Sequence, residues 1–239
     1  MKSIGNGFIL SNFYVDNYIN LIKRQNAIIA FKNSLVLAFS TSTIIIIIGL
    51  IAAYIIVRLK VKGSGLLEYL CNMPMGISGT ALALGLIFMY LTKPLSYLNI
   101  YGTLGILLIA YVTKQLPLGV RYCQSSIIQI SSELEEASRI SGASWIKTMG
   151  KITIPLAKTG IIYAWILSFI NVFPELSSST LLRNAKTDVV ATAILDLWDG
   201  SGGLPQAAAF GTVVCLLITL LVMIAQKIAG QSMLEKSVR

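Results

Sequence analysis

The sequence predicts an all-α fold: a polytopic transmembrane bundle of about five spanning helices, with one short helix outside the membrane. Hydrophobic residues make up 55% of the 239 residues, only 12% are charged, and the mean hydropathy is +0.77. A single soluble domain cannot bury that much apolar surface in its core. Long apolar stretches recur along the chain, each close to the roughly 20 residues that a helix needs to cross a bilayer.

Five stretches reach this length. The first contains an unbroken run of isoleucines, Lys114 interrupts the third, and Glu175 interrupts the fourth. The last stretch is rich in alanine where it begins. The predicted spans are residues 34–57, 69–91, 101–120, 159–182 and 206–226.

Basic residues in the short loops predict the orientation, since Lys and Arg are retained on the cytoplasmic side during insertion. Arg58, Lys60 and Lys62 follow the first span, and five further Lys or Arg residues lie between the third and fourth spans. Both loops are therefore predicted inside, and the loop 183–205 outside. Five spans then place the N-terminus outside, although four of the first 33 residues are basic and run against the rule.

Three regions follow from these assignments. Residues 1–33 are predicted to form an external or interfacial segment, residues 34–229 a single transmembrane domain, and residues 230–239 a cytoplasmic tail. An external N-terminus raises the hypothesis that a further helix belongs before the first span, or that a fused or neighbouring half supplies it.

Two segments are apolar but too short to span. Residues 189–198 form an apolar stretch between two aspartates, and residues 14–29 carry apolar residues at near-helical spacing. Both fit helices that lie at the outer interface of the membrane, and both also fit packed external loops.

Composition argues against several kinds of function. The chain has no histidine, the commonest metal ligand and general base, so neither catalysis nor a metal site is expected. Cys71, Cys123 and Cys215 form no CxxC pair and are interpreted as small hydrophobic residues. The net charge of +9 is attributed to membrane topology, and no nucleic-acid partner is expected.

The loop 131–158 between the third and fourth spans predicts a helix, a turn and a second helix. Ser132 and Glu135 have the spacing of a capping box, so the first helix is expected to begin near Glu133. Gly142 suits the left-handed conformation that ends a helix, and Pro155 suits the first turn of the next one.

This loop resembles the EAA loop of permeases that belong to binding-protein-dependent ABC importers of the type I fold. The EAA pattern is Glu-Ala-Ala, three residues, Gly, nine residues and Ile-x-Leu-Pro. The sequence has the same spacing, with Ser in place of the second Ala and Ile in place of Leu, at Glu136, Ala137, Ser138, Gly142, Ile152, Ile154 and Pro155. Outside the loop the resemblance is loose, although it extends from the first span to the last.

The resemblance implies a cytoplasmic coupling helix that docks on a separate ATPase. Glu135, Glu136, Ala137, Ser138, Gly142, Ile152 and Pro155 would form the coupling site, with Glu136 pairing with a basic group of the ATPase. The chain lacks the G-x-x-x-x-G-K-[ST] phosphate loop, so ATP and Mg²⁺ are expected on the partner and no cofactor on this chain. The implied partners are an ATPase dimer, a second permease half, an external solute-binding protein and membrane lipid.

Three polar residues within the spans are candidates for the translocation path. An ionisable group at membrane depth usually faces a cavity or a partner, which selects Lys114 and Glu175. Asn171 is predicted one helical turn before Glu175 on the same face. Lys114 also fits a side chain that extends to the cytoplasmic headgroups, and Glu175 also fits a structural pair with an external Lys or Arg.

The predicted function is solute import across the bacterial inner membrane by alternating access. The stretch 175–182 and the Leu197 to Gly200 segment resemble the branch of permeases for iron(III), 2-aminoethylphosphonate, polyamines or thiamine, with iron(III) as first choice. A secondary transporter or channel is the alternative, and it requires ionisable relays within the membrane. A membrane enzyme is disfavoured, because no carboxylate cluster or activated nucleophile is evident.

Overall fold

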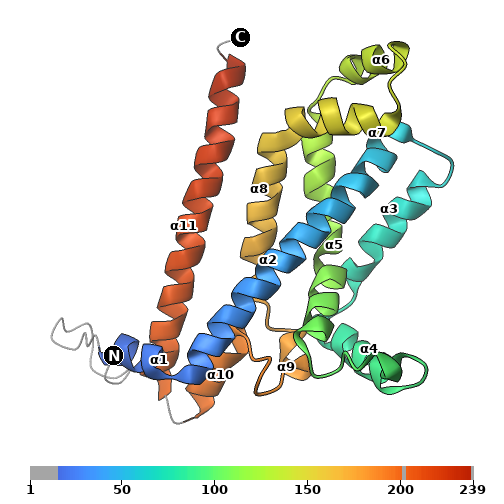
Figure 1. Ribbon diagram of the computed structural model, residues 1–239. Coiled ribbons are helices and arrows are strands. Elements are labelled where there is room, and N and C mark those ends of the chain that lie inside the picture. Colours follow the sequence, from blue (N-terminus) through green and yellow to red (C-terminus); the bar gives the residue numbers. More distant parts are fainter. Residues whose placement is uncertain (1–15, 201–202, 238–239) are drawn as a thin grey trace.

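The computed structural model describes residues 16–200 and 203–237, and the regular elements within them are helices (Figure 1). The α-helices are α1 Asp16–Lys23, α2 Gln25–Tyr54, α3 Ser64–Asn72, α4 Gly79–Leu91, α5 Leu104–Ile128, α6 Ser132–Ile140, α7 Trp145–Thr148, α8 Ile154–Val172, α9 Ser179–Leu182, α10 Val190–Asp199 and α11 Gly203–Ser237. Two π-helical turns, Ile55–Leu59 and Met149–Thr153, extend α2 and join α7 to α8. Short 3₁₀ turns occupy Met73–Gly76 and Leu95–Leu98.

The prediction of about five spans is confirmed. Four helical runs are long and apolar enough to cross a membrane, and the number is five if one bent pair of helices is counted as a single span. The runs are Gln25–Leu59, Leu104–Ile128, Trp145–Val172 and Gly203–Lys227, and the bent pair is Ser64–Gly76 with Gly79–Leu91.

Different helices and loops lie at the two ends of the bundle. The α2–α3 junction, α6 and the C-terminal part of α11 lie at one end, here called the α6 end (Figure 1). Helices α1, α4, α9 and α10 lie at the opposite end, the α10 end. The two basic loops therefore share one end, as predicted, and residues 183–200 lie at the other.

The second span is broken, although residues 69–91 were expected to form one helix. Its two halves meet at an angle of 103°. Pro74 has no N–H to continue the α-helical ladder, so the chain tightens into a 3₁₀ turn and Ile77 becomes extended. Ser78 then begins α4, and its hydroxyl accepts the Ala81 N–H.

The fourth span is shifted from residues 159–182 to the helical run Trp145–Val172. It begins earlier because the π-helical turn connects α7 to α8 without a break. It ends earlier because Pro174 follows and has no N–H to continue the ladder, although Phe173 before it keeps a helical backbone. Glu175 consequently lies in a turn beyond the helix, and the prediction that places it inside a span is wrong.

The N-terminal boundary also differs from the prediction. Helix α2 begins at Gln25, so the first span includes residues 25–33 that were assigned to the external segment. Arg24 has an extended backbone and separates α2 from the short helix α1. The stretch 14–29, which fitted one helix by its pattern, is therefore divided between α1 and α2. The remaining part of that segment, residues 1–15, lies outside the described residues.

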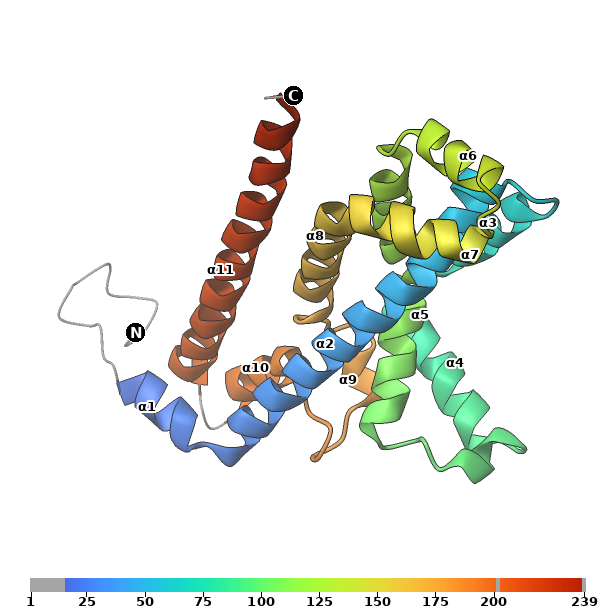
Figure 2. The ribbon, with the colours of Figure 1, turned by 45° about the horizontal axis from the view of Figure 1, so that its top comes forward.

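Both C-terminal predictions of helix are confirmed in part. The apolar stretch 189–198 forms α10, which packs against α2 and α11 and buries Val190, Ala193 and Leu197. Helix α11 extends past the predicted span to Ser237, so most of the predicted tail is helical. It packs against α1, α8 and α10 and stands apart from α5 in both views (Figures 1 and 2).

The centre of the bundle is formed by α2, α5 and α8, which pack against one another. Helices α2 and α5 approach closely at two glycines: a Cβ at Gly49 would lie 3.1 Å from the Gly119 carbonyl, and one at Gly119 would lie 3.3 Å from Ile45. Small residues permit such contact between membrane helices, where dispersion forces replace the hydrophobic effect. The glycine pair therefore fixes the spacing of the two central helices.

This packing predicts that Gly49→Leu destabilises the chain by about 1–3 kcal/mol, because the added side chain has no room against α5. Thermal unfolding of the purified chain in detergent measures the effect. Gly85→Leu is the control, since a Cβ at Gly85 has no atom within 4 Å, and it should leave the melting temperature nearly unchanged. Equal effects of the two substitutions would contradict the packing argument.

Candidate functional site

The loop 131–158, which resembles the EAA loop, forms a helical hairpin at the α6 end, as predicted. The cap of α6 is Ser131, one residue before the predicted Ser132, and its hydroxyl accepts the Glu133 N–H. Gly142 has a φ of +81°, the left-handed conformation expected at the end of α6. Ser144 then caps α7 by accepting the Lys147 N–H, which turns the chain back toward α8.

One face of α6 points away from the bundle. Glu136 and Ala137 are exposed on it, and Ile140 is 88% exposed, a high value for a large apolar side chain. Ser138 is half-buried, and its hydroxyl lies 3.0 Å from that of Thr148 in α7, so it joins the two helices of the hairpin. The free face of α6 thus combines a carboxylate, small residues and exposed apolar side chains.

Glu135 does not belong to that free face, and the prediction that it completes a capping box is wrong. It is only 5% exposed, because its carboxylate points into the bundle. The Thr153 hydroxyl donates to its Oε1 at 2.8 Å and the Tyr54 hydroxyl to its Oε2 at 3.3 Å. Arg58 completes the site with an ion pair of 3.3 Å between Nε and Oε1.

The other two residues of the pattern lie along the second arm of the hairpin. Ile152 is half-buried in the π-helical turn, whereas Pro155 is exposed in the first turn of α8. Pro155 follows the prediction for its position in α8, but the preceding π-helical turn makes it part of one continuous run rather than the start of a separate helix.

Lys114 and Glu175, the two charged candidates for the translocation path, form an ion pair of 2.9 Å. The side chain of Lys114 is 25% exposed and that of Glu175 is 10% exposed. Lys114 therefore pairs within the bundle and does not extend to the headgroups, and the partner of Glu175 is a residue of a span, not of an external loop. Asn171 is separate: its amide donates to the Leu167 carbonyl of its own helix, and Glu175 lies beyond that helix.

The chain around this pair is closely packed. Lys114 and Glu175 both hydrogen-bond the Ser177 hydroxyl, and the Tyr111 hydroxyl reaches the Glu175 carbonyl at 3.3 Å. A Cβ at Gly79 would lie 2.8 Å from Cβ of Ser177, so the glycine allows the Ser177 side chain to approach the start of α4 closely. The ion pair thus joins α5 to the turn after α8, directly beside the break in the second span.

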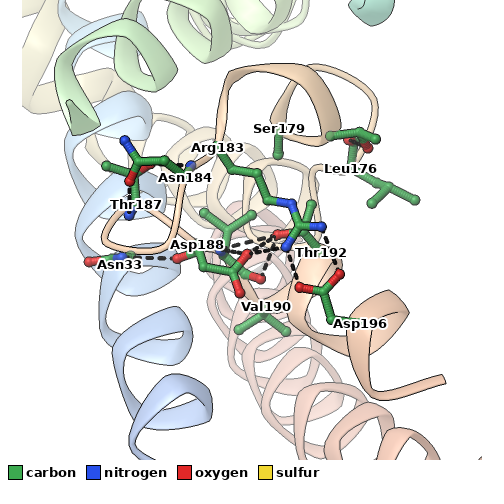
Figure 3. A network of polar contacts seen from close by, with 12 residues as sticks. Asn33, Leu176, Ser179, Arg183, Asn184, Thr187, Asp188, Val190, Thr192 and Asp196 are labelled. Carbon is green, nitrogen blue, oxygen red and sulfur yellow. Dashed lines mark hydrogen bonds and ion pairs between the residues drawn. The ribbon is translucent and has the colours of Figure 1, made fainter. Parts of the chain in front are cut away.

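A third polar cluster, which the sequence analysis did not identify, lies at the α10 end (Figure 3). Arg183 pairs with Asp188 at 3.0 Å and, through both terminal nitrogens, with Asp196 of α10. From α2, the Asn33 amide donates to the carbonyls of Lys186 and Asp188. These contacts hold the loop between α9 and α10 against the start of the first span.

The charges of this cluster favour one another. Hydrogen bonds from Arg183 lower the pKa of the Asp196 carboxyl below its ordinary value, although partial burial acts in the opposite direction. Asp188 is further held by the Thr192 hydroxyl, which donates to Oδ1 at 2.6 Å. Arg183, the cation of this cluster, is therefore engaged by the carboxylates of Asp188 and Asp196.

Within residues 16–200 and 203–237 no group of three or more His, Cys, Asp or Glu side chains is placed to hold an ion. Cys71 and Cys123 are buried separately, and Cys215 is exposed on α11.

The fold and the hairpin define a class of protein: a polytopic helical membrane protein with the fold of a type I ABC importer permease. The family model of the binding-protein-dependent transport system inner membrane component matches residues 45–235. The chain belongs to this family, and it is a multi-pass protein of the inner membrane.

Two relatives illustrate the range of the family. The chain is 29% identical over 206 residues to the ferric transport system permease protein FbpB of Actinobacillus pleuropneumoniae, which covers 86% of this chain and 29% of that protein. It is 25% identical to the spermidine/putrescine transport system permease protein PotC of Haemophilus influenzae, over 90% of this chain and 81% of that protein. The chain thus spans less than a third of the ferric permease it matches.

A solved structure confirms the fold. The bacterial alginate ABC transporter, crystallised with an alginate pentasaccharide-bound periplasmic protein, contains a chain that superposes with a TM-score of 0.70. The match covers 90% of this chain and 82% of that one at 19% sequence identity. At this identity the likeness concerns the fold alone.

The buried ion pair predicts a non-additive effect of substitution. Lys114→Met leaves the Glu175 carboxylate without its cation and should cost about 1–3 kcal/mol of stability. Adding Glu175→Gln removes that unpaired charge, so the double variant should be more stable than Lys114→Met alone. Thermal unfolding in detergent measures both.

Lys158→Met is the matched control for the lysine, because Lys158 is exposed on α8. It should change stability by less than about 0.5 kcal/mol. A double variant no more stable than Lys114→Met alone would show that Lys114 and Glu175 do not act as a pair.

Proposed function

We propose that this chain is the permease subunit of an ATP-driven importer and moves a small solute across the inner membrane by alternating access. The observation that carries the proposal is α6, a helix held outside the bundle with Glu136, Ala137 and Ile140 exposed on its free face. Exposed apolar surface with polar residues at its rim marks sites that bind other proteins. The free face of α6 is the proposed docking site for the ATPase.

The proposed assembly contains an ATPase dimer, a second permease half that is identical or homologous, and an external solute-binding protein. This chain does not hydrolyse ATP, because it has no phosphate-binding loop, so ATP and Mg²⁺ belong to the ATPase. The binding protein docks at the α10 end, opposite α6. ATP binding closes the ATPase dimer, the displacement enters through Glu136 to Gly142, and the spans rock about the bundle centre.

Iron(III) is the proposed solute, ahead of 2-aminoethylphosphonate, polyamines and thiamine. Support comes from the similarity to the ferric permease FbpB, whereas the similarity to PotC keeps polyamines as an alternative. The scarcity of metal ligands on this chain does not oppose iron, because a permease passes its solute on and need not bind it tightly. Lys114 and Glu175 are the proposed residues of the solute pathway. Their ion pair lies beside the broken second span, and transporters commonly form their solute sites at broken helices.

Reversal of one charge tests the docking site. Glu136→Lys should abolish ATP-driven uptake, because like charges facing each other across an interface cost several kcal/mol. Uptake is measured in membrane vesicles that contain the assembled transporter. The amount of chain in the membrane is the control and should not change, and normal uptake by the variant would refute the assignment of α6.

The turn after α6 gives a second test. Gly142→Asp should abolish uptake, because a residue with a Cβ is strained by about 1–2 kcal/mol at a φ of +81° and the hairpin changes its bend. Gly65→Asp is the control: Gly65 is exposed near the α6 end, without a positive φ and with no atom within 4 Å of a Cβ. Normal uptake by the control and loss in Gly142→Asp are expected.

The solute is tested by direct competition. Vesicles with the binding protein, ATPase and permease should accumulate radioactive iron(III) when ATP is supplied, and excess spermidine or thiamine should not reduce the uptake. Accumulation of spermidine instead of iron would exclude the iron assignment and leave the import function intact.

A further inference from the structure

We propose that Glu135 is a positioning residue that couples α6 to the membrane helices, with Arg58, Tyr54 and Thr153 as its partners; the proposal rests on the proposed function of α6. These four residues are here called the Glu135 node. The free face of α6 binds the ATPase, and the Glu135 node on the opposite face makes α6 move together with α2, α5 and α8.

The node connects four elements through one carboxylate. Glu135 belongs to α6, Tyr54 is the last residue of α2, and Thr153 lies directly before α8. Arg58 adds α5, because one terminal nitrogen donates to the Ile127 carbonyl at 2.8 Å and also to that of Ile130. Ile127 lies in the last turn of α5, where its carbonyl also accepts the Ile130 N–H, and Ile130 lies just beyond the helix.

The Glu135 node is largely buried. Tyr54 is fully buried, Glu135 is 5% exposed, and the side chain of Arg58 is 12% exposed. A charge in such a place is stable only while its partners remain in reach, and removing one partner from a buried pair is costly. Movement of α6 away from the ends of α2 and α8 would therefore break several interactions at once.

The helices are distorted where they supply the node. Within the described residues there are two π-helical turns, Ile55–Leu59 and Met149–Thr153. The first carries Arg58 and the second carries Thr153, and both side chains reach the same carboxylate. A π-helical turn inserts a residue into the helix at a cost in stability and is frequently found at functional sites.

An aromatic contact supports the same connection. Trp145, the first residue of α7, stacks on Tyr54 with ring centroids 6.3 Å apart and planes 26° apart. Both arms of the hairpin are thus attached to the end of α2, α6 through Glu135 and α7 through Trp145. These contacts do not involve Glu136, whose side chain is exposed on the free face of α6.

The test compares Glu135→Gln with Glu68→Gln in the transporter assembled with its ATPase. Glutamine keeps the size of the side chain but removes the charge that pairs with Arg58. We expect Glu135→Gln to retain the ATPase, while the amount of solute moved per ATP hydrolysed falls about tenfold, a typical size for coupling between two sites. Glu68→Gln makes the same change at an exposed glutamate of α3, outside α6, and should behave as the native chain.

A distance measurement separates coupling from simple loss of structure. Spin labels are placed at Ser132→Cys on α6 and Ile51→Cys on α2, both exposed, in a Cys215→Ser background that removes the exposed native thiol. In the native node the distance distribution is narrow and stays narrow when ATP is added. In Glu135→Gln it broadens with ATP, because α6 moves without α2.

Thr153→Val is the milder variant in case Glu135→Gln does not fold. It keeps both charges and removes only the hydroxyl that donates to Glu135, so the loss of solute moved per ATP should be about fivefold or less. Unchanged distance distributions and unchanged solute-to-ATP ratios in both variants would overturn the proposal. Absence of a bound ATPase in the native chain would instead refute the proposed function, so the two failures are distinguishable.

Discussion

Backbone N–H and C=O groups without partners are costly inside a bilayer, and the helix breaks of this chain lie where side chains supply those partners. At the break in the second span, the Ser78 hydroxyl accepts a free N–H of α4. After α8, Glu175 accepts the Ser178 N–H, and the Ser179 hydroxyl donates to the Glu175 carbonyl. At the end of α5, the Arg58 guanidinium donates to the carbonyls of Ile127 and Ile130. The polar side chains of the bundle are therefore placed by the irregular backbone that they satisfy.

Local features of the sequence were enough to predict the number of spans, their order and the hairpin between the third and fourth. Apolar length determines whether a helix crosses the membrane, and the positions of Gly142 and Pro155 depend on local backbone geometry. Such signals lie within one segment of chain, so no knowledge of the neighbouring helices is needed. The boundaries failed where a proline acts inside an apolar stretch, at Pro74 and Pro174, because hydropathy does not register a missing N–H.

Pairing between distant residues could not be predicted in the same way. Lys114 and Glu175 were selected because each is charged within an apolar stretch, but their contact depends on how α5 meets the turn after α8. Glu135 carried a misleading local signal, since its spacing from Ser132 fits a cap. Charged residues occur all around α6, and only the packing against Tyr54 and Thr153 reveals which of its faces is buried. Arg183 and Asp196 are 13 positions apart, with no periodic pattern to connect them.

The arrangement of these ties matters for any mechanism that moves the bundle from one end. A displacement applied to α6 reaches the α10 end only if it is not absorbed by rearrangement on the way. The Glu135 node attaches α6 to α2, α5 and α8, the glycine contact at Gly49 and Gly119 joins α2 to α5 at their centres, and Asn33 fixes the far end of α2 to the loop before α10. Helix α2 is thus held at both ends and in the middle. Because its helical run is continuous from Gln25 to Leu59, it is the element best built to carry displacement across the membrane.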